Sequence, residues 1–517
     1  IRLHYYAAKD FTKNYKTGSI FRVDNSVGDK VQVIISDIQS YLPSMNYMLA
    51  FNKEEDLVWY WDEPTITLDY EEHPFHEILQ RNWNQNVIPN VVLSSATLPN
   101  MADITEMLQS YRYKFKESNI VEILSYECKK SIPIISKEGY KMLPHYMFEE
   151  YNVIKESLRH IEKNKTILRH FDVDEISKFI MYINKNEFVS DKYLIKEYFQ
   201  EIGDINIINI KIYYLLLLKK CKKNWKEIYD YFQKKRKKTY ESTIKITTSD
   251  ANTLTDGPTI FLTNDVKKLA GIYLKASEIS SNEIENIMQV INKNEKWKKD
   301  LEKVEDGERQ RQEKKSEILR DKNLKMDTKE YQLLEKYKKQ IEIIRSRIQS
   351  VELKKTFVPN TKQHIRKWTE KDDRTNEFTC RIGEEVVEEI MLLNVSNAWK
   401  ILLLMGIGCF IREDKGKDSK EQIKYMEIMK KLAEEQKLYL IIASSDYIYG
   451  TNYQFCHGYL SKDLANMTQE KTIQAFGRIG RKNNQMDYTL RVRDDTLIKK
   501  LFLPEENNIE VVNMNRL

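Results

Sequence analysis

The chain has 517 residues, of which 84 are Lys or Arg and 78 are Asp or Glu, so its formal net charge is +6. This length predicts two or three domains, and the near balance of charge excludes a dedicated polycation. With 41% hydrophobic residues, 15 glycines and 10 prolines, the sequence is neither disordered as a whole nor collagen-like.

The cysteines and the apolar runs indicate where the protein works. Its five cysteines include no C-x-x-C pair, which argues against a disulfide framework or a structural zinc site and favours a reducing compartment. The longest apolar run, Ile212 to Leu218, is too short to span a bilayer, and the first residues do not resemble a signal peptide. We therefore expect no membrane segment and an intracellular location, cytoplasmic or nuclear. Because the chain opens at Ile1 rather than at Met, we also expect it to be a piece of a longer protein.

The first predicted elements, up to Asn100, are short apolar runs that end in polar residues, which is typical of buried parallel strands. The runs are Val33–Ile35 before Ser36-Asp37, Leu57–Trp61 before Asp62-Glu63, and Val91–Leu93 before Ser94-Ser95. Ligands of open parallel sheets bind at the carboxyl ends of the strands, so these polar residues are candidates for chemistry.

The middle of the chain is predicted to be helical. From about Tyr151 to Tyr240 the sequence has no strand alternation, and a new strand begins only at Thr259–Leu262. Within the helical part, 219–238 carries ten Lys or Arg, two acidic residues and four aromatic residues. Such a segment either binds a nucleic-acid strand or is a lysine-fringed helix with its aromatic rings packed inward, at about even odds.

A charged stretch from Asn282 to Leu353 interrupts the second α/β part. Its later half has a 3-4 spacing of apolar residues, which predicts a coiled-coil seam, and its earlier half supplies an opposing arm. The seam residues are Leu334, Tyr337, Ile341, Ile344, Ile348 and Val351. We expect an antiparallel helical hairpin with Glu305-Asp306-Gly307 and the polar stretch after it near its tip. The α/β pattern resumes after about Cys380, with an amphipathic helix near Tyr425 and a buried strand at Leu438–Ala443.

The strongest motif is Gln474-Ala-Phe-Gly477-Arg478-Ile-Gly480-Arg481. Its five fixed positions would match by chance in roughly one chain of this length in ten thousand. If the stretch is helical, Gln474, Arg478 and Arg481 share one face, so that an amide and two guanidiniums point into one cleft. Guanidiniums suit charge that develops on a transferring phosphoryl group. The alternative is a solvated basic helix end.

This motif resembles the sixth motif of superfamily 2 helicases, and other motifs of that family occur in the family's order. Asp62-Glu63-Pro64-Thr65 resembles the second motif and Ser95-Ala96-Thr97 the third. Gly257–Leu262 resembles the fourth motif, and Ser444–Asn452 resembles the fifth. The residues of the fifth motif resemble those of the DExH branch, which includes exosome-associated RNA helicases. They also resemble those of helicases of large DNA viruses. If the protein is viral, we expect it in the host cytoplasm.

The resemblance implies an ATP-dependent helicase or translocase that moves on RNA or DNA. Asp62 would hold Mg²⁺ and Glu63 would activate the hydrolytic water. Gln474, Arg478 and Arg481 would reach the ATP, which lies between the lobes, from the second lobe. Gly450 and Asn452 would contact the nucleotide, and three hydroxyl residues would couple its state to the grip on nucleic acid. These coupling residues are Ser95, Thr97 and Thr451.

The fold that this resemblance implies is α/β, with two RecA-like lobes and the first of them truncated. We assign 1–150 to the first lobe, 151–242 to a helical connecting segment and 243–281 to the start of the second lobe. Residues 282–356 form the inserted charged hairpin, a candidate site for a protein partner, and 357–517 complete the second lobe.

Two departures from the family pattern matter. The second motif ends in Thr65, which cannot relay to the third motif as Asp or His would. No G-x-x-x-x-G-K-[ST] phosphate loop occurs in the sequence. We expect that loop upstream, and we expect this chain alone to be inactive as an ATPase. The alternatives are a non-catalytic helicase-like scaffold that binds nucleic acid or a partner, and a double-stranded DNA translocase.

One further cluster, His73 and His76 with nearby glutamates, imitates a metal site. The spacing of His73 and His76 would suit metal binding only on a helix, and Pro74 breaks that helix. Metal binding there is therefore the less favoured hypothesis.

Overall fold

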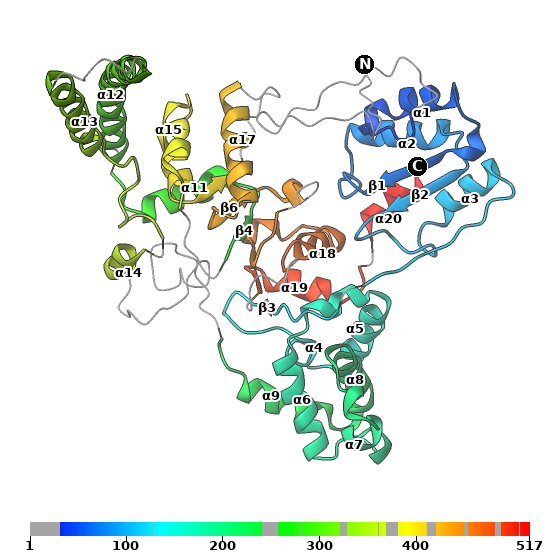
Figure 1. The fold of residues 1–517 in the computed structure, drawn as a ribbon. Coiled ribbons are helices and arrows are strands. Elements are labelled where there is room, and N and C mark those ends of the chain that lie inside the picture. Colours follow the sequence, from blue (N-terminus) through cyan, green and yellow to red (C-terminus); the bar gives the residue numbers. More distant parts are fainter. Residues whose placement is uncertain are drawn as a thin grey trace.

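The computed structural model describes the ranges 31–126, 128–239, 257–280, 282–320, 328–359, 361–368, 381–410, 420–448, 453–480, 488–505 and 507–517. The structure is mixed α/β, and its paired strands are parallel. They form a two-stranded sheet, which we call the small sheet, and a six-stranded sheet, which we call the large sheet. Figure 1 shows the small sheet at one side of the molecule, with the C-terminus beside it, and the large sheet nearer the centre.

The small sheet pairs β1 (Val58–Asp62) with β2 (Asn90–Ser94). Trp59 and Trp61 point to the buried face of β1, so alternation within the strand decides which face carries the core. The helices packed on that core are α1 (Tyr41–Leu49), α2 (Phe75–Gln85), α3 (Thr105–Lys114) and α20 (Ile509–Asn515). The predictions of strands at 57–61 and 91–93 are confirmed.

The large sheet has the strand order β3-β8-β7-β4-β6-β5. Its strands are β3 (Ile134–Ile135), β8 (Thr489–Val492), β7 (His457–Leu460), β4 (Thr259–Leu262), β6 (Leu440–Ala443) and β5 (Ile407–Cys409). Every strand residue is buried, as expected for a parallel sheet covered on both faces. The predicted strands at 259–262 and 438–443 are therefore confirmed.

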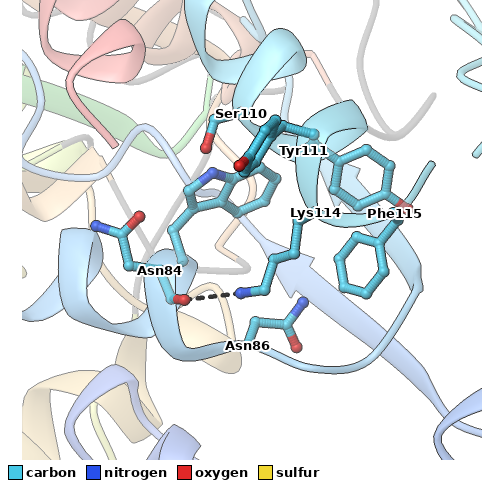
Figure 2. Close-up of a pocket in the computed structure, with 8 residues that line it drawn as sticks. Asn84, Asn86, Ser110, Tyr111, Lys114 and Phe115 are labelled. Carbon is cyan, nitrogen blue, oxygen red and sulfur yellow. Dashed lines mark hydrogen bonds between the residues drawn. The ribbon is translucent and has the colours of Figure 1, made fainter.

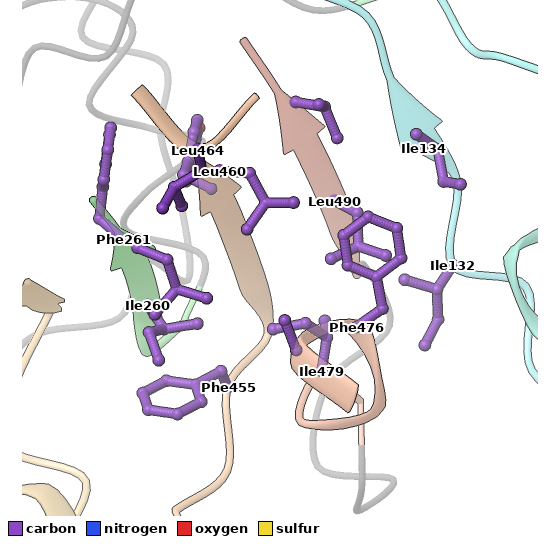
Figure 3. Packing of buried hydrophobic residues seen from close by; sticks show 14 of the residues in the cluster. Ile132, Ile134, Ile260, Phe261, Phe455, Leu460, Leu464, Phe476, Ile479 and Leu490 are labelled. Atoms are coloured by element: carbon purple, nitrogen blue, oxygen red, sulfur yellow. The ribbon is translucent and has the colours of Figure 1, made fainter. Parts of the chain in front are cut away.

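Helices that alternate with these strands complete the large α/β unit. They are α11 (Val266–Ala276), α14 (Lys362–Trp368), α15 (Glu384–Leu392), α16 (Asn397–Leu404), α17 (Lys420–Glu434), α18 (Gln469–Gly477) and α19 (Asp495–Leu501). Figure 3 shows Phe476 of α18 and Ile479 just after it packed beside Leu490 of β8. A Cβ atom at Gly458 of β7 would lie 2.9 Å from Cδ1 of Ile479, so this close packing requires a glycine.

A helical segment separates β3 from β4 in the sequence and lies at one end of the molecule in Figure 1. Its helices are α4 (Pro144–Met147), α5 (Tyr151–Lys163), α6 (Val173–Lys185), α7 (Ile195–Tyr198), α8 (Ile207–Lys220) and α9 (Trp225–Lys235). Short 3-10 helices occur at Ile38–Ser40, Glu54–Asp56, Lys165–His170, Asp191–Tyr193, Ile202–Asp204, Lys222–Asn224, Ser445–Ile448 and Lys462–Leu464. No strand occurs in 151–239, which confirms the predicted helical character.

Two long helices, α12 (Asn282–Arg320) and α13 (Thr328–Arg347), lie side by side at the far edge of the molecule (Figure 1). Arg345 pairs with Glu305 at 2.7 Å, and Gly307 lies against the ring of Tyr337. Of the residues predicted near the tip, Glu305-Asp306-Gly307 lie inside α12, which continues to Arg320, so α12 ends in the polar stretch after them. A Cβ at Gly307 would lie 3.2 Å from Cε1 of Tyr337, so this glycine serves close helix packing rather than a turn.

Three further segments differ from expectation or lie far from their sequence neighbours. The strand predicted at Val33–Ile35 is absent, since 31–37 forms no strand and the side chain of Ile35 is 89% exposed. β3, within the part assigned to the first lobe, pairs with β8 in the large sheet. α20, within the part assigned to the second lobe, buries Met514 in the core of the small sheet. The chain therefore crosses between the two sheets more often than a simple division in sequence order implies.

Candidate functional site

Three segments that are far apart in the sequence meet at the carboxyl ends of the small-sheet strands. Glu63 directly follows β1, Ser95 directly follows β2, and Gln474 lies on α18 of the large unit. Asp62 and Ser94, the last residues of the two strands, lie opposite each other in the parallel register. The sheet thus delivers the two motif segments to one edge, as the general rule for parallel strands predicts.

A hydrogen-bond network joins these residues directly. Ser95 Oγ donates to Oε2 of Glu63 at 2.7 Å, and Thr97 N donates to Ser95 Oγ at 3.3 Å. Gln474 Nε2 donates to Thr97 Oγ1 at 2.7 Å and to Glu63 Oε2 at 3.3 Å. One carboxylate oxygen therefore accepts from a hydroxyl and from an amide. We call Glu63, Ser95, Thr97 and Gln474 the four-residue network.

Glu63 reaches this position through an uncommon backbone conformation. Its φ is +49°, in the left-handed region that residues with a Cβ seldom adopt. Its N–H donates to the carbonyl oxygen of Ser94 at 2.7 Å, which ties the end of one strand to the end of the other. Strained backbone of this kind clusters at functional sites, where surrounding contacts hold it in place.

Gln474 is positioned by the way α18 is anchored. Thr468 caps the helix through its side chain, which accepts from the N–H of Lys471 at 3.2 Å. At the other end Phe476 and Ile479 are buried against the large sheet. These anchors leave Gln474 only 5% exposed and directed toward the small sheet.

The sixth motif is not helical to its end, contrary to the premise that put both its arginines on one face. α18 ends at Gly477, Arg478 is its C-cap, and Gly480 has a φ of +66°. Only glycine enters that conformation without steric cost, so the second glycine of the motif permits a turn after the helix has ended. Arg478 lies close to Tyr447, where its charge opposes the rise in the pKa of Tyr447 that burial causes.

Several predicted site residues lie outside the described residues. These are Gly450, Thr451, Asn452 and Arg481.

Asp62 is exposed at the end of β1 and offers the hard oxygen ligands that Mg²⁺ prefers. Within the ranges that the structure covers, no three His, Cys, Asp or Glu side chains gather as a metal site. Thr65 is fully buried and its Oγ1 has no hydrogen-bond partner among the described residues. The contact between the second and third motifs therefore runs through Glu63 and Ser95.

Four residues beside the network were not singled out from the sequence. Lys471 Nζ lies 2.7 Å from Oδ2 of Asp69 and 3.0 Å from Oδ1 of Asp446. Tyr70 donates its hydroxyl to Asp446 at 2.6 Å, and its ring lies 4.9 Å from Lys471 Nζ. The available signal was the position of Lys471 three residues before Gln474, which puts the two on neighbouring turns of one helix face.

Two other candidates have structural explanations. In the basic segment, Trp225 and Phe232 are buried, and the indole Nε1 of Trp225 donates to the carbonyl of Glu149 at 2.8 Å. These two rings pack inward, whereas Tyr229 is half-buried and Tyr231 is exposed and stacked on Tyr182. Binding of nucleic acid by this segment stays a prediction.

The histidines His73 and His76, which resemble a metal site in the sequence, have protein partners. A ring nitrogen of His76 lies 2.8 Å from the carbonyl oxygen of Thr67, and Phe75 N donates to His73 Nδ1.

A cavity of about 220 Å³ lies at the opposite end of the small sheet (Figure 2). Its lining residues are Trp83, Asn84, Asn86, Ser110, Tyr111, Tyr113, Lys114 and Phe115. Lys114 Nζ donates to the carbonyl of Asn84 at 2.7 Å, and Tyr111 donates to the carbonyl of Pro89, just before β2 begins. The cavity is therefore at the amino end of β2 and separate from the four-residue network. It is also smaller than typical ligand pockets.

No model of a known protein family matches this chain, and no curated protein sequence matches it. None of the helices in the described ranges combines the length and the hydrophobicity needed to span a bilayer.

Proposed function

We propose that this chain is the core of an ATP-dependent helicase or translocase of superfamily 2, acting on RNA or DNA. The observation that carries the proposal is the four-residue network. It joins three segments that resemble three separate motifs of that family, and Glu63 and Gln474 are 411 positions apart in the sequence. Contacts across such a separation require the whole fold to bring them together, which supports a shared role for these segments.

In this proposal each parallel sheet is the centre of one RecA-like lobe. In this proposal ATP binds between them, with its phosphates near Asp62 and Glu63. Mg²⁺ held by Asp62 would neutralise the developing phosphate charge.

The roles of this chain's own residues follow from the contacts. Glu63 Oε2 is held by donors from Ser95 and Gln474, so its carboxylate is fixed in position to accept a proton from an attacking water. Gln474 belongs to the large unit, whereas Glu63 and Thr97 belong to the small-sheet unit. Separation of the two units would therefore remove a donor from the carboxylate, which couples the state of the site to the relative position of the lobes.

The experiment is a comparison of two proteins. One is the 517-residue chain, and the other, which we call the extended protein, is the same chain expressed with any coding sequence that lies upstream of it. We expect the extended protein to hydrolyse Mg²⁺-ATP faster when single-stranded RNA or DNA is added. The 517-residue chain should show no stimulated hydrolysis, because backbone amides and a lysine normally hold the triphosphate. Phosphate release measures both.

Strand-displacement assays on RNA, DNA and hybrid duplexes then identify the substrate class. Stimulated hydrolysis by the 517-residue chain would contradict the assignment of a missing phosphate loop. If no nucleic acid stimulates ATP hydrolysis by the extended protein, the result would favour the non-catalytic scaffold function instead.

The pair of helices α12 and α13 is proposed to be an inserted hairpin that binds a partner and contributes little to the chemistry. Its base closes through Asn294 and Gln349, whose side chain and backbone exchange hydrogen bonds of 2.7 and 3.0 Å. Replacement of 295–348 by a short Gly-Ser linker should leave the melting temperature of the α/β units nearly unchanged. Hydrolysis by the extended protein should also persist. Differential scanning fluorimetry and phosphate release check the two expectations.

The matched control removes the base as well. Ile284, Ile287 and Ile291 of α12 are buried in the core of the large unit together with Val351 and Leu353. Replacement of 282–353 should therefore lower the melting temperature, since it removes core side chains. Equal melting temperatures for the two deletions would contradict this division between arm and base.

A further inference from the structure

A buried lysine lies beside the four-residue network. Lys471 is 3% exposed, and the side chain of its partner Asp69 is 5% exposed. An ammonium group withdrawn from water is costly unless it is paired and hydrogen-bonded. Burial alone lowers the pKa of Lys471, but the hydrogen bond to Asp69 and the charges of Asp69 and Asp446 outweigh it, so that the pKa is raised. Lys471 therefore remains a buried cation at neutral pH.

The lysine connects three parts of the fold. Asp69 and Tyr70 lie in the segment that follows β1, and Asp446 lies in the turn that follows β6 of the large sheet. Lys471 itself is in α18. Asn513 of α20 holds the segment after β1 from another side, because its Nδ2 donates to the carbonyl oxygens of Leu68 and Tyr70.

Lys471 and Gln474 form two contacts between the same two segments. Gln474 meets Glu63 at one end of the segment 63–70, and Lys471 meets Asp69 at the other. The two residues are three positions apart on α18, which corresponds to a rise of about 4.5 Å. The helix is already anchored at its two ends, through Thr468 and through Phe476, and the two contacts add a defined rotation of this face of α18 against the segment.

The segment 63–70 is stiff enough to transmit this constraint. Consecutive turns link Ile66 N to the carbonyl of Glu63 at 3.2 Å and Leu68 N to the carbonyl of Thr65 at 3.0 Å. Leu68 is buried in the core of the small sheet. These turns and the buried Leu68 hold Asp69 and Glu63 in a constant relative position, so the contact of Lys471 with Asp69 also sets α18 relative to Glu63.

We propose that Lys471 is a positioning residue that sets Gln474 against Glu63 and Thr97 through its contact with Asp69. The role rests on the proposed function, since it matters for catalysis only if Glu63 acts on bound ATP. In this proposal Lys471 acts through the rotation of α18 against Asp69.

The first experiment does not depend on hydrolysis. In the 517-residue chain, Lys471→Met should accelerate amide hydrogen exchange in 63–70 and in α18, because the second contact is lost. Lys499→Met, at an exposed position on α19, is the matched control and should leave exchange in both segments unchanged. Unchanged exchange in the Lys471→Met chain would overturn the proposal.

The second experiment separates positioning from simple stability. In the extended protein, Lys471→Met should lower kcat by about tenfold or more with little change in KM for ATP. The double variant Asp69→Leu with Lys471→Met removes both charges, so its melting temperature should recover while its kcat stays low. A double variant with both wild-type melting and wild-type kcat would overturn the proposal. If the unmodified extended protein fails to hydrolyse ATP, the proposed function fails, and the exchange experiment still decides the positioning role.

Discussion

Glu63→Gln in the extended protein should reduce ATP turnover by on the order of a hundredfold or more while ATP still binds. The amide keeps the shape of the side chain but cannot accept the proton of the attacking water. Ser95 and Gln474 would still donate to the remaining carbonyl oxygen, so the network should persist. Steady-state phosphate release measures turnover, and a fluorescent ATP analogue measures binding.

Glu72→Gln is the matched control for that substitution. Glu72 is exposed, and it belongs to the same unit as Glu63. Its replacement should change neither turnover nor binding. Wild-type turnover by the Glu63→Gln protein would exclude Glu63 as the base, and a loss of ATP binding would indicate that its charge mainly holds the metal.

Glu510→Gln should stabilise the 517-residue chain above neutral pH and reduce the pH dependence of its unfolding. Glu510 of α20 is 1% exposed, and Thr468 Oγ1 donates to its Oε1 at 3.2 Å. Burial, assisted by the nearby charges of Glu470 and Asp69, raises the pKa of Glu510 from 4.5 to about 9. The folded chain therefore keeps a proton that the unfolded chain releases.

The sign of the effect follows from this difference in proton binding. Below pH 4.5 the carboxyl is protonated in both states and has no effect on the free energy of unfolding. As the pH rises from there to about 9, the unfolded state alone gains the favourable charge, so stability falls. At pH 7 the cost is on the order of 3 kcal/mol, and glutamine avoids it.

Thermal unfolding at pH 5, 7 and 8.5 measures this prediction. The melting temperature of Glu510→Gln should exceed that of the wild type at pH 8.5 and approach it at pH 5. Glu385→Gln, at an exposed position on α15, should follow the wild type at every pH. Parallel pH profiles for the wild type and Glu510→Gln would contradict the buried, protonated state of Glu510. Glu470, whose pKa burial and the charge of Glu505 raise to about 7, should leave a weaker residual dependence.

Local patterns in the sequence were sufficient for most strands and helices. The apolar runs at 57–61, 91–93 and 259–262 form strands in the structure, and the segment from 151 to 239 is helical. These features depend on neighbours within a few residues, and such neighbours are visible in the sequence. The run Val33–Ile35 has the same apolar character, but it pairs with no strand among the described residues, and Val33 and Ile35 are exposed.

The sequence by itself determined that Glu63, Ser95 and Thr97 follow parallel strands and that Gln474 lies on a helix. Only the tertiary structure decided which of the motif residues touch, where the sixth motif leaves its helix, and that Lys471 is buried against Asp69. Lys471 and Asp69 are 402 positions apart, and α20 reaches the small sheet from the far end of the chain. Contacts of that kind depend on how the two sheets meet. Burial of the Lys471 ammonium is costly unless a carboxylate pairs with it. The carboxylate is that of Asp69, and no pattern of neighbouring residues in the sequence shows that the two meet.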